Sequence, residues 1–97
     1  MPTYIHLIQF ADQGIRNIQD TVKRGDAAIA EARKMGINIV EEYWTMGAYD
    51  AAVVIEAPDD ETMSAFALKV GSLGNVKGQT LRAFRRNEME KILAKMK

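Results

Sequence analysis

The sequence predicts an α+β fold, built from one four-stranded antiparallel β-sheet with two helices on one face and a further helix at the C-terminus. The chain has 97 residues, which is enough for one domain with a single hydrophobic core, over residues 1–97. Strand-like and helix-like segments follow one another in the order strand, helix, strand, strand, helix, strand, helix. Only Gly47 and Ala48 separate the two middle strands, so these strands must be antiparallel. This order is that of the split βαβ, or ferredoxin-like, motif βαββαβ.

The first strand is expected at residues 3–10, a run of β-branched and aromatic side chains. A helix is expected within residues 15–35, because apolar residues recur there at alternating steps of three and four. Gly36 is suited to end this helix in the left-handed conformation. Three residues could each serve as its N-cap: Asn17, Asp20 and Thr21.

The middle of the chain is expected to form a hairpin followed by a second helix. Residues 37–46 and 49–57 are the two β-rich runs, and Pro58 ends the second one because it has no N–H to donate to a neighbouring strand. Asp59 or Asp60 is expected to cap the helix. Its buried face is expected to consist of Met63, Phe66, Ala67 and Val70.

The last strand is expected at residues 76–85, and a terminal helix follows it. Asn87 is expected to cap this helix, with Glu90 three residues later as in a capping box. Its apolar side chains share one face: Met89, Ile92, Leu93 and Met96.

The strands carry more apolar surface than the helices can cover. Two helices cover one face of a four-stranded sheet, yet residues 3–10 and 51–55 have apolar side chains on both faces. A large exposed apolar patch usually marks an interface or a ligand groove. We therefore expect a second copy of the chain to cover the other face, giving a homodimer or a higher homo-oligomer. Burial of several hundred Å² would contribute on the order of 10 kcal/mol before the cost of association is subtracted.

Composition excludes several classes of function. Thirteen Lys plus Arg balance thirteen Asp plus Glu, and no segment is strongly basic, so nucleic acid is not expected as a partner. The chain has no cysteine and one histidine, so neither a metal site within one chain nor a cofactor is expected. No apolar run approaches the length of a membrane span, and the N-terminus leads into a strand. We expect a soluble cytoplasmic protein with no membrane partner.

Three segments together resemble a known family. They are Gly47-Ala48-Tyr49-Asp50, Phe10-Ala11-Asp12-Gln13-Gly14-Ile15 and Gly71-Ser72-Leu73-Gly74-Asn75-Val76. With them the chain resembles the GYD-domain family over nearly its whole length. That family is similar to the dimeric α/β-barrel superfamily, so the resemblance implies that ferredoxin-like subunits pair their sheets face to face. The superfamily includes cofactor-free oxygenases, isomerases, dehalogenase-like proteins and ligand-sensing domains of transcription regulators, and kinship of that breadth implies no particular activity.

His6 is the first candidate catalytic residue, because its side chain is the only one that titrates near neutral pH without help. Its place in the first strand puts it on the same face as Tyr4 and Ile8. It could act as a general base in a partly apolar cavity. It could equally be a hydrogen-bonded histidine of the core or of an interface.

Tyr49 and Asp50 are the other candidate catalytic residues. Adjacent strand residues point to opposite faces, so only one of them could project toward a cavity, Asp50 as a base or Tyr49 as a donor to an oxyanion. The alternative is structural, with Asp50 binding N–H groups of the turn and Tyr49 packing at the edge.

Candidate ligand-binding residues are aromatic and basic. Tyr4, Tyr43 and Trp44 could line an apolar pocket, or could belong to a dimer core, where aromatic residues are also enriched. Arg24 and Arg82 could hold a carboxylate or a phosphate. They could instead form ion pairs with acidic neighbours, for which the sequence offers Glu41, Glu42 and Glu56.

Two functions are consistent with these residues. The first is an oligomeric protein that binds a small organic ligand, or a cofactor-free enzyme for proton transfer or oxygenation, with its pocket between sheet and helices or between paired sheets. The second is a non-catalytic ligand-sensing or oligomerisation module in which the same aromatic residues are core.

Overall fold

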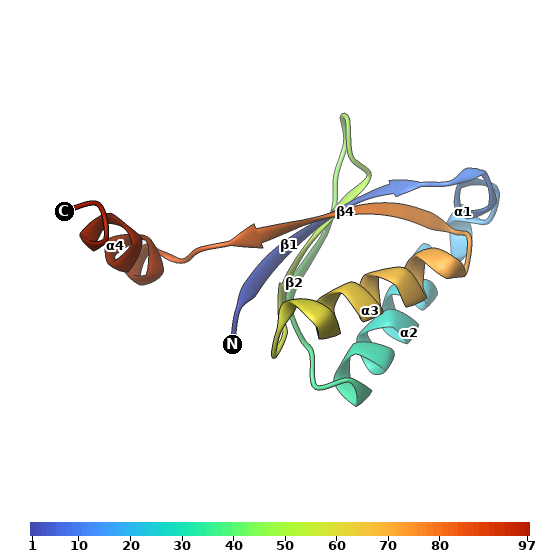
Figure 1. The fold of residues 1–97 in the computed structure, drawn as a ribbon. Coiled ribbons are helices and arrows are strands. Elements are labelled where there is room, and N and C mark those ends of the chain that lie inside the picture. The colour runs from blue at the N-terminus through green and yellow to red at the C-terminus, as the bar shows by residue number, and fades with distance from the viewer.

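The computed structural model describes residues 1–97 and confirms the α+β, ferredoxin-like architecture (Figure 1). The sheet has the strand order β2-β3-β1-β4, and every pair of neighbours is antiparallel. The elements in chain order are β1 (Thr3–Phe10), α1 (Asp12–Arg16), the 3-10 helix η1 (Ile18–Asp20), α2 (Thr21–Lys34), β2 (Asn38–Trp44), β3 (Ala51–Glu56), α3 (Asp60–Ser72), β4 (Val76–Ala83) and α4 (Arg86–Ala94). None of these helices is long and apolar enough to span a membrane.

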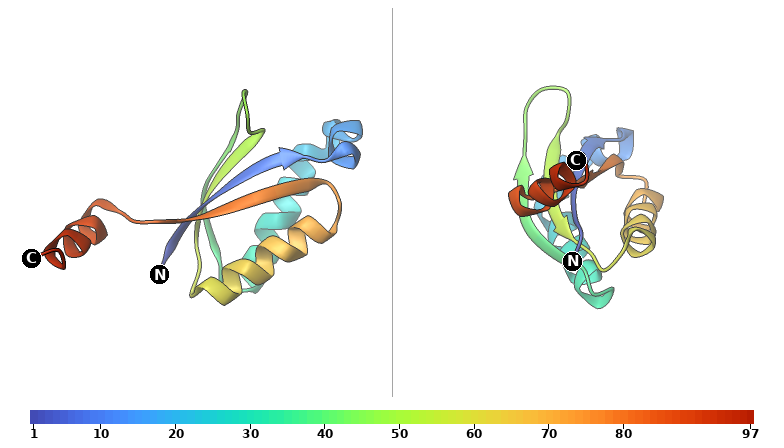
Figure 2. Two further views of the ribbon diagram at one scale, coloured as in Figure 1. Left: turned by 45° about the horizontal axis from the view of Figure 1, so that its top comes forward. Right: turned by 60° about the vertical axis from the view of Figure 1, so that its left-hand side comes forward.

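Helices α2 and α3 lie on the same face of the sheet, as Figures 1 and 2 show. The strand register identifies the residues that face these helices. Tyr4 is paired with Ile55 and His6 with Val53, so the four side chains lie on the same face of the sheet. These residues are all buried, so this parity of β1 and β3 faces the helices. The other parity, which includes Ile5 and Val54, points to the open face of the sheet.

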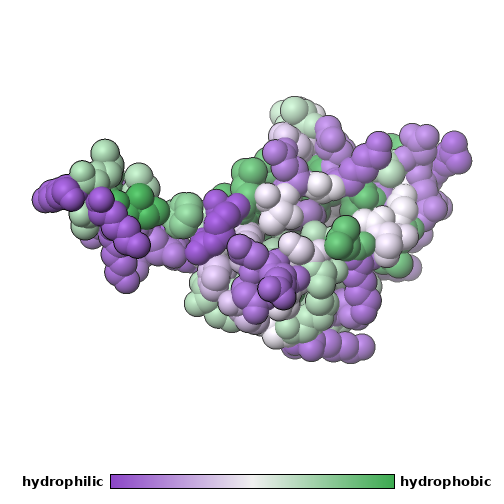
Figure 3. Space-filling view, viewed as in Figure 1, coloured by the Kyte–Doolittle hydropathy of each residue, from purple (hydrophilic) through white to green (hydrophobic).

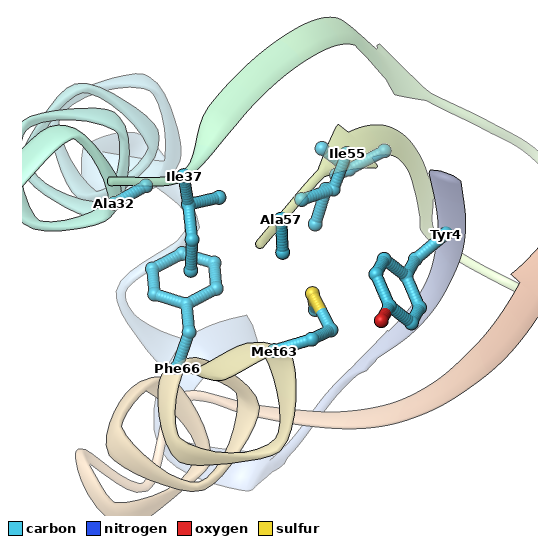
Figure 4. Close-up of a cluster of buried hydrophobic side chains, with 8 residues drawn as sticks. Tyr4, Ala32, Ile37, Ile55, Ala57, Met63 and Phe66 are labelled. Carbon is cyan, nitrogen blue, oxygen red and sulfur yellow. The ribbon is translucent and has the colours of Figure 1, made fainter. Parts of the chain in front are cut away.

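The hydrophobic core lies between the sheet and α3. Figure 4 shows Met63 and Phe66 of α3 pointing toward Ile37, Ala57 and Tyr4. Burial of Met63 and Phe66 was expected and is confirmed. The buried cluster consists of Tyr4, Ala32, Ile37, Val53, Ile55, Ala57, Met63 and Phe66.

The helical region expected within residues 15–35 is broken into three pieces. Gly14 lies in α1 so close to the connection between α3 and β4 that a Cβ at Gly14 would be 2.0 Å from the carbonyl oxygen of Asn75. This approach fixes α1 against the start of β4, and the backbone N–H of Ala11 donates to the same oxygen. The chain must then turn before α2 can begin. Asp20 precedes α2, but its side chain makes no capping hydrogen bond.

The hairpin connection is longer than the expected two-residue turn. Strand β2 ends at Trp44 and β3 begins at Ala51, so the loop spans residues 45–50. It is held by a bond from the N–H of Thr45 to the carbonyl oxygen of Asp50, and Gly47 has a φ of +113°, which favours glycine. A register shift between Ile39 and Glu41 adds a bulge to β2.

The caps of the last two helices differ from each other in how well the sequence predicts them. Asp59 caps α3, with its carboxylate accepting from the N–H of Thr62 at 2.8 Å, as expected. The prediction that Asn87 caps α4 is wrong. The helix begins at Arg86, so the extended residue before it, Arg85, is the N-cap. The carboxylate that reaches back is therefore that of Glu88, which accepts from the N–H of Arg85 at 3.0 Å.

Helix α4 stands apart from the rest of the molecule (Figures 1 and 2). None of its residues is buried, and Met89 and Leu93 are exposed, as is Met96 just after the helix. Figure 3 shows apolar side chains among the charged ones on this outlying segment. The open face of the sheet is also apolar at its centre, where Ile5 and Val54 are only partly buried. Two apolar surfaces of the chain thus have no partner within it.

Candidate functional site

A cavity of about 400 Å³ lies between the sheet and helices α2 and α3. Its volume falls within the usual range for small-molecule sites, which is roughly 300–1,000 Å³. The floor is formed by the helix-facing side chains of the strands and the walls by the two helices. Most of the lining is apolar and includes Ile8, Phe10, Ala28, Ile39, Phe66 and Val70.

His6 is a buried polar residue of the cavity floor, with 6% of its surface exposed. Its Nδ1 lies 2.9 Å from the hydroxyl oxygen of Thr80 on the neighbouring strand β4. Burial lowers the pKa of His6 below its ordinary value of 6.5, so the imidazole is neutral at pH 7. Its Nε2 makes no hydrogen bond within the chain.

Gly78 provides the space for the His6 ring. A Cβ at position 78 would lie 2.2 Å from Cε1 and 2.3 Å from Nε2 of His6, far inside contact distance. Any larger residue at position 78 would therefore push the imidazole from its place. The glycine is required by the histidine and not by its own backbone, since its φ is not positive.

The strand register places Glu42 in the same row as His6. Thr80 pairs with His6, His6 with Val53, and Val53 with Glu42, so the row crosses all four strands on the helix-facing side. Glu42 is half-buried in the cavity lining, and its carboxylate lies near Gly25 of α2, where a Cβ would be 3.1 Å from Oε2. Burial, together with the nearby Asp26, raises the pKa of Glu42 above its ordinary value.

The remaining polar groups of the lining are already bonded. Arg24 donates to the carbonyl oxygens of Asn17 at 2.7 Å and Gly14 at 3.2 Å, which ties α2 to the broken helical segment before it. The indole N–H of Trp44 donates to the hydroxyl of Thr21 at 3.1 Å. Another pair, Lys69 and Glu31, joins α3 to α2 by an ion pair.

Three of the site residues expected from sequence come together at this cavity, namely His6, Trp44 and Arg24. Tyr4 does not line it. The Tyr4 ring is in the core with 3% of its surface exposed, and its hydroxyl donates to Asp60 at 2.5 Å. Burial, followed by that hydrogen bond, raises the pKa of Tyr4 to about 12.

The other expected residues also lie outside the cavity. Asp50 accepts from the N–H of Phe10 at 2.8 Å, which joins the hairpin loop to the end of β1. The hydroxyl of Tyr49 donates to Gln79 at 3.0 Å. Tyr43, which is exposed, bonds to Glu41 on the side of β2 away from the cavity.

Arg82 lies at the opposite end of the sheet from the hairpin loop. Its guanidinium is over the rings of Tyr4, at 5.6 Å, and Phe84, at 4.7 Å. It also donates to the carbonyl oxygen of Thr3 at 3.2 Å. These contacts stabilise the junction between β4 and α4, away from the cavity.

Sequence reasoning did not single out Glu42, Thr80 or Gly78 as site residues. The signal for Glu42 is its parity with Trp44 on β2, but the bulge after Ile39 breaks the alternation that would have revealed it. Thr80 and Gly78 can be recognised only once β4 is known to pair with β1.

Comparison with known proteins decides the family. The family model described as GYD domain matches residues 4–93. The chain belongs to the GYD-domain family. The GYD domain is also 34% identical over 84 residues to a protein of Thermus thermophilus named "Glutamine synthetase and cystathionine beta-lyase binding protein". That match covers 86% of this chain and 88% of the relative.

Solved structures share the fold of this GYD domain. The crystal structure of TTHA0845 from Thermus thermophilus matches with a TM-score of 0.63 and 28% identity, over 88% of this chain and 95% of that one. The crystal structure of FFRP-DM1 matches with a TM-score of 0.60 and 20% identity, over 87% and 100% of the two chains. The second likeness concerns the fold alone.

Proposed function

We propose that this GYD-domain protein is a homo-oligomeric cytoplasmic protein that binds a small, largely apolar molecule in the cavity between the sheet and α2 and α3. The observation that carries the proposal is the cavity of about 400 Å³ with the buried His6 in its floor. A buried polar group usually has its hydrogen bonds satisfied, and here Nδ1 is satisfied by Thr80 while Nε2 is left for a ligand.

Chemistry in the same cavity would rest on His6. A neutral imidazole that is buried beside apolar walls can accept a proton, which is what proton transfer or a cofactor-free oxygenation requires of a base. The Thr80 hydroxyl would hold the ring in one orientation. Without turnover, the same cavity would serve a ligand-sensing module.

Filling the cavity tests the proposal. Ala28 of α2 lines it and Ala30 of the same helix is exposed outside it, so Ala28→Phe and Ala30→Phe are a matched pair. We expect native mass spectrometry of freshly purified protein to detect a retained small molecule in the parent and in Ala30→Phe, but not in Ala28→Phe. Retention by Ala28→Phe with an unchanged melting temperature would contradict binding in this cavity.

The homo-oligomer is proposed to form through the open face of the sheet. Ile5, Val54 and Leu81 make this face apolar, and Leu81 is 39% exposed in the single chain. Leu81→Lys would place a charge in the interface, whereas Leu68→Lys changes an exposed leucine of α3. We expect light scattering to give the 10.8 kDa mass of a single chain only for Leu81→Lys. A parent protein that is already monomeric at micromolar concentration would contradict the proposed dimer.

A second candidate function is binding to other enzymes. It is favoured by the relative from Thermus thermophilus, whose name describes binding to glutamine synthetase and cystathionine beta-lyase. The test is gel filtration of this chain mixed with each of these two enzymes from its own organism. Co-elution would support the function, and separate elution of both mixtures would argue against it.

A further inference from the structure

Glu42 is a carboxylate at the cavity without a partner. Glu42 lies in the same row as Thr80, His6 and Val53, and its carboxylate takes part in no hydrogen bond or ion pair within the chain. Its neighbour Glu41 differs, because Glu41 bonds to Tyr43 on the opposite side of β2. A half-buried carboxylate without a counter-charge costs free energy unless a donor reaches it.

The two cations that line the cavity are bonded to other groups. Lys69 forms an ion pair with Glu31, and Arg24, which precedes Gly25 in α2, donates to two backbone carbonyls and not to Glu42. The nearby group that acts on Glu42 is another acid, Asp26. Because the Glu42 carboxylate has no cation bonded to it and a second acid nearby, an anionic group placed against Glu42 would meet repulsion.

The spacing of the row separates the two free polar groups. His6 and Glu42 are on strands β1 and β2, with β3 and its Val53 between them, which is about 10 Å at the usual distance between neighbouring strands. The floor between them is apolar, as are most of the walls. A ligand with an apolar body over Val53 would thus reach the Glu42 carboxylate with one end.

We propose that Glu42 is a specificity-determining residue of this cavity, which selects molecules that carry a basic amine on an apolar body and rejects the matching carboxylates. The proposal rests on the proposed binding function and names the chemical class of its ligand. An ammonium group supplies both the missing donors and the missing positive charge, and charge-assisted hydrogen bonds are about twice as strong as neutral ones.

Three probes with the same aromatic body test the selectivity: 2-(1-naphthyl)ethylamine, 2-(1-naphthyl)ethanol and 1-naphthylacetate. Calorimetric titration is made with the parent, Glu42→Gln and the matched control Glu41→Gln. We expect the parent to bind the amine at least about tenfold more tightly than the acetate. Glu42→Gln is expected to lose about tenfold for the amine and little for the alcohol, while Glu41→Gln behaves like the parent.

Any other result contradicts either the role of Glu42 alone or the proposed binding function as well. If the probes bind but the preference for the amine is absent, or persists in Glu42→Gln, the role of Glu42 is wrong and the cavity remains a binding site. If Ala28→Phe still binds the amine, or if no probe binds the parent at millimolar concentration, both the selectivity and the proposed binding function fail.

Discussion

The contact between His6 and Gly78 shows how two residues far apart in sequence define one site. The imidazole occupies the space that a side chain at position 78 would need, and Thr80 binds its Nδ1 from the same strand. One edge strand thus makes room for the ring and also orients it. The result is a buried imidazole with one nitrogen satisfied and the other free.

Gly78→Ala is expected to destabilise the fold by about 1–3 kcal/mol, because its methyl group would collide with the His6 ring. Urea denaturation measures the loss. In the double variant with His6→Ala the collision is absent, so the cost of Gly78→Ala should largely disappear. Equal costs in both backgrounds would show that the collision is not what position 78 avoids.

The protonation of His6 gives a prediction on stability and pH. Burial lowers the pKa of His6 in the folded chain, while the unfolded chain takes up a proton near 6.5. Below pH 6.5 the unfolded state then binds more protons, so the free energy of unfolding falls as the pH is lowered through this range, by at most about 1.4 kcal/mol per pH unit.

Denaturation at pH 7.5 and pH 5.5 measures this effect, with His6→Gln as the control. We expect the parent to lose more stability over this interval than the variant does. Glu42 has a raised pKa and acts with the opposite sign, but it is present in both proteins and cancels in the comparison. The same loss in parent and variant would contradict the effect of His6.

At the scale of elements, periodicity predicted most of the fold but not its interruptions. The strands and the two covering helices follow from residue patterns that local structure imposes. The break before α2 does not, because it depends on the approach of Gly14 to Asn75, which are far apart in sequence. The hairpin loop is longer than predicted for a similar reason, since Asp50 bonds to β1 through Phe10.

The candidate site was partly predictable for the same reasons. Parity in β1 correctly placed Tyr4 and His6 on one face. Yet Tyr4 lies beneath the start of α3, where its hydroxyl bonds to Asp60, and His6 lies in the floor of the cavity. Parity alone cannot tell where along a strand a helix covers it. Glu42 was considered only as an ion-pair partner, because its row with His6 depends on the register of three strands.

The cap of α3 gives a prediction at this scale. Asp59→Ala is expected to destabilise the chain by about 1 kcal/mol, because the N–H of Thr62 loses its acceptor. Glu61→Ala is the control, since Glu61 is an exposed acid in the same first turn. Thermal unfolding of both variants makes the comparison. An Asp59→Ala melting temperature no lower than that of the control would contradict the role of this cap.

The whole molecule is elongated, with extents of 52 × 31 × 18 Å, and α4 accounts for its outlying end. A nine-residue helix is marginal in water without tertiary packing. Within one chain α4 has little such packing. Its contacts with the rest of the chain are polar and lie at its base, where Arg85 bonds to Thr3 and Glu56 and where Glu88 forms an ion pair with Arg82. Its stability therefore depends on what covers its apolar face.

Hydrogen exchange measured at two protein concentrations tests this dependence. In dilute solution we expect the amides of α4 to exchange much faster than those of α3, whose Met63 and Phe66 are buried. At the higher protein concentration, the amides of α4 should exchange more slowly if another copy covers Leu93 and its neighbours. Equal protection of α3 and α4 in dilute solution would mean that α4 packs on its own chain.

The close fit of the imidazole over Gly78 also constrains how this protein can diverge. A lineage that keeps His6 has to keep glycine at position 78, whereas a lineage that replaces the histidine by a small residue is released from that restriction. The two positions should accordingly change together among descendants, with glycine at 78 being lost only after, or along with, the aromatic ring at 6.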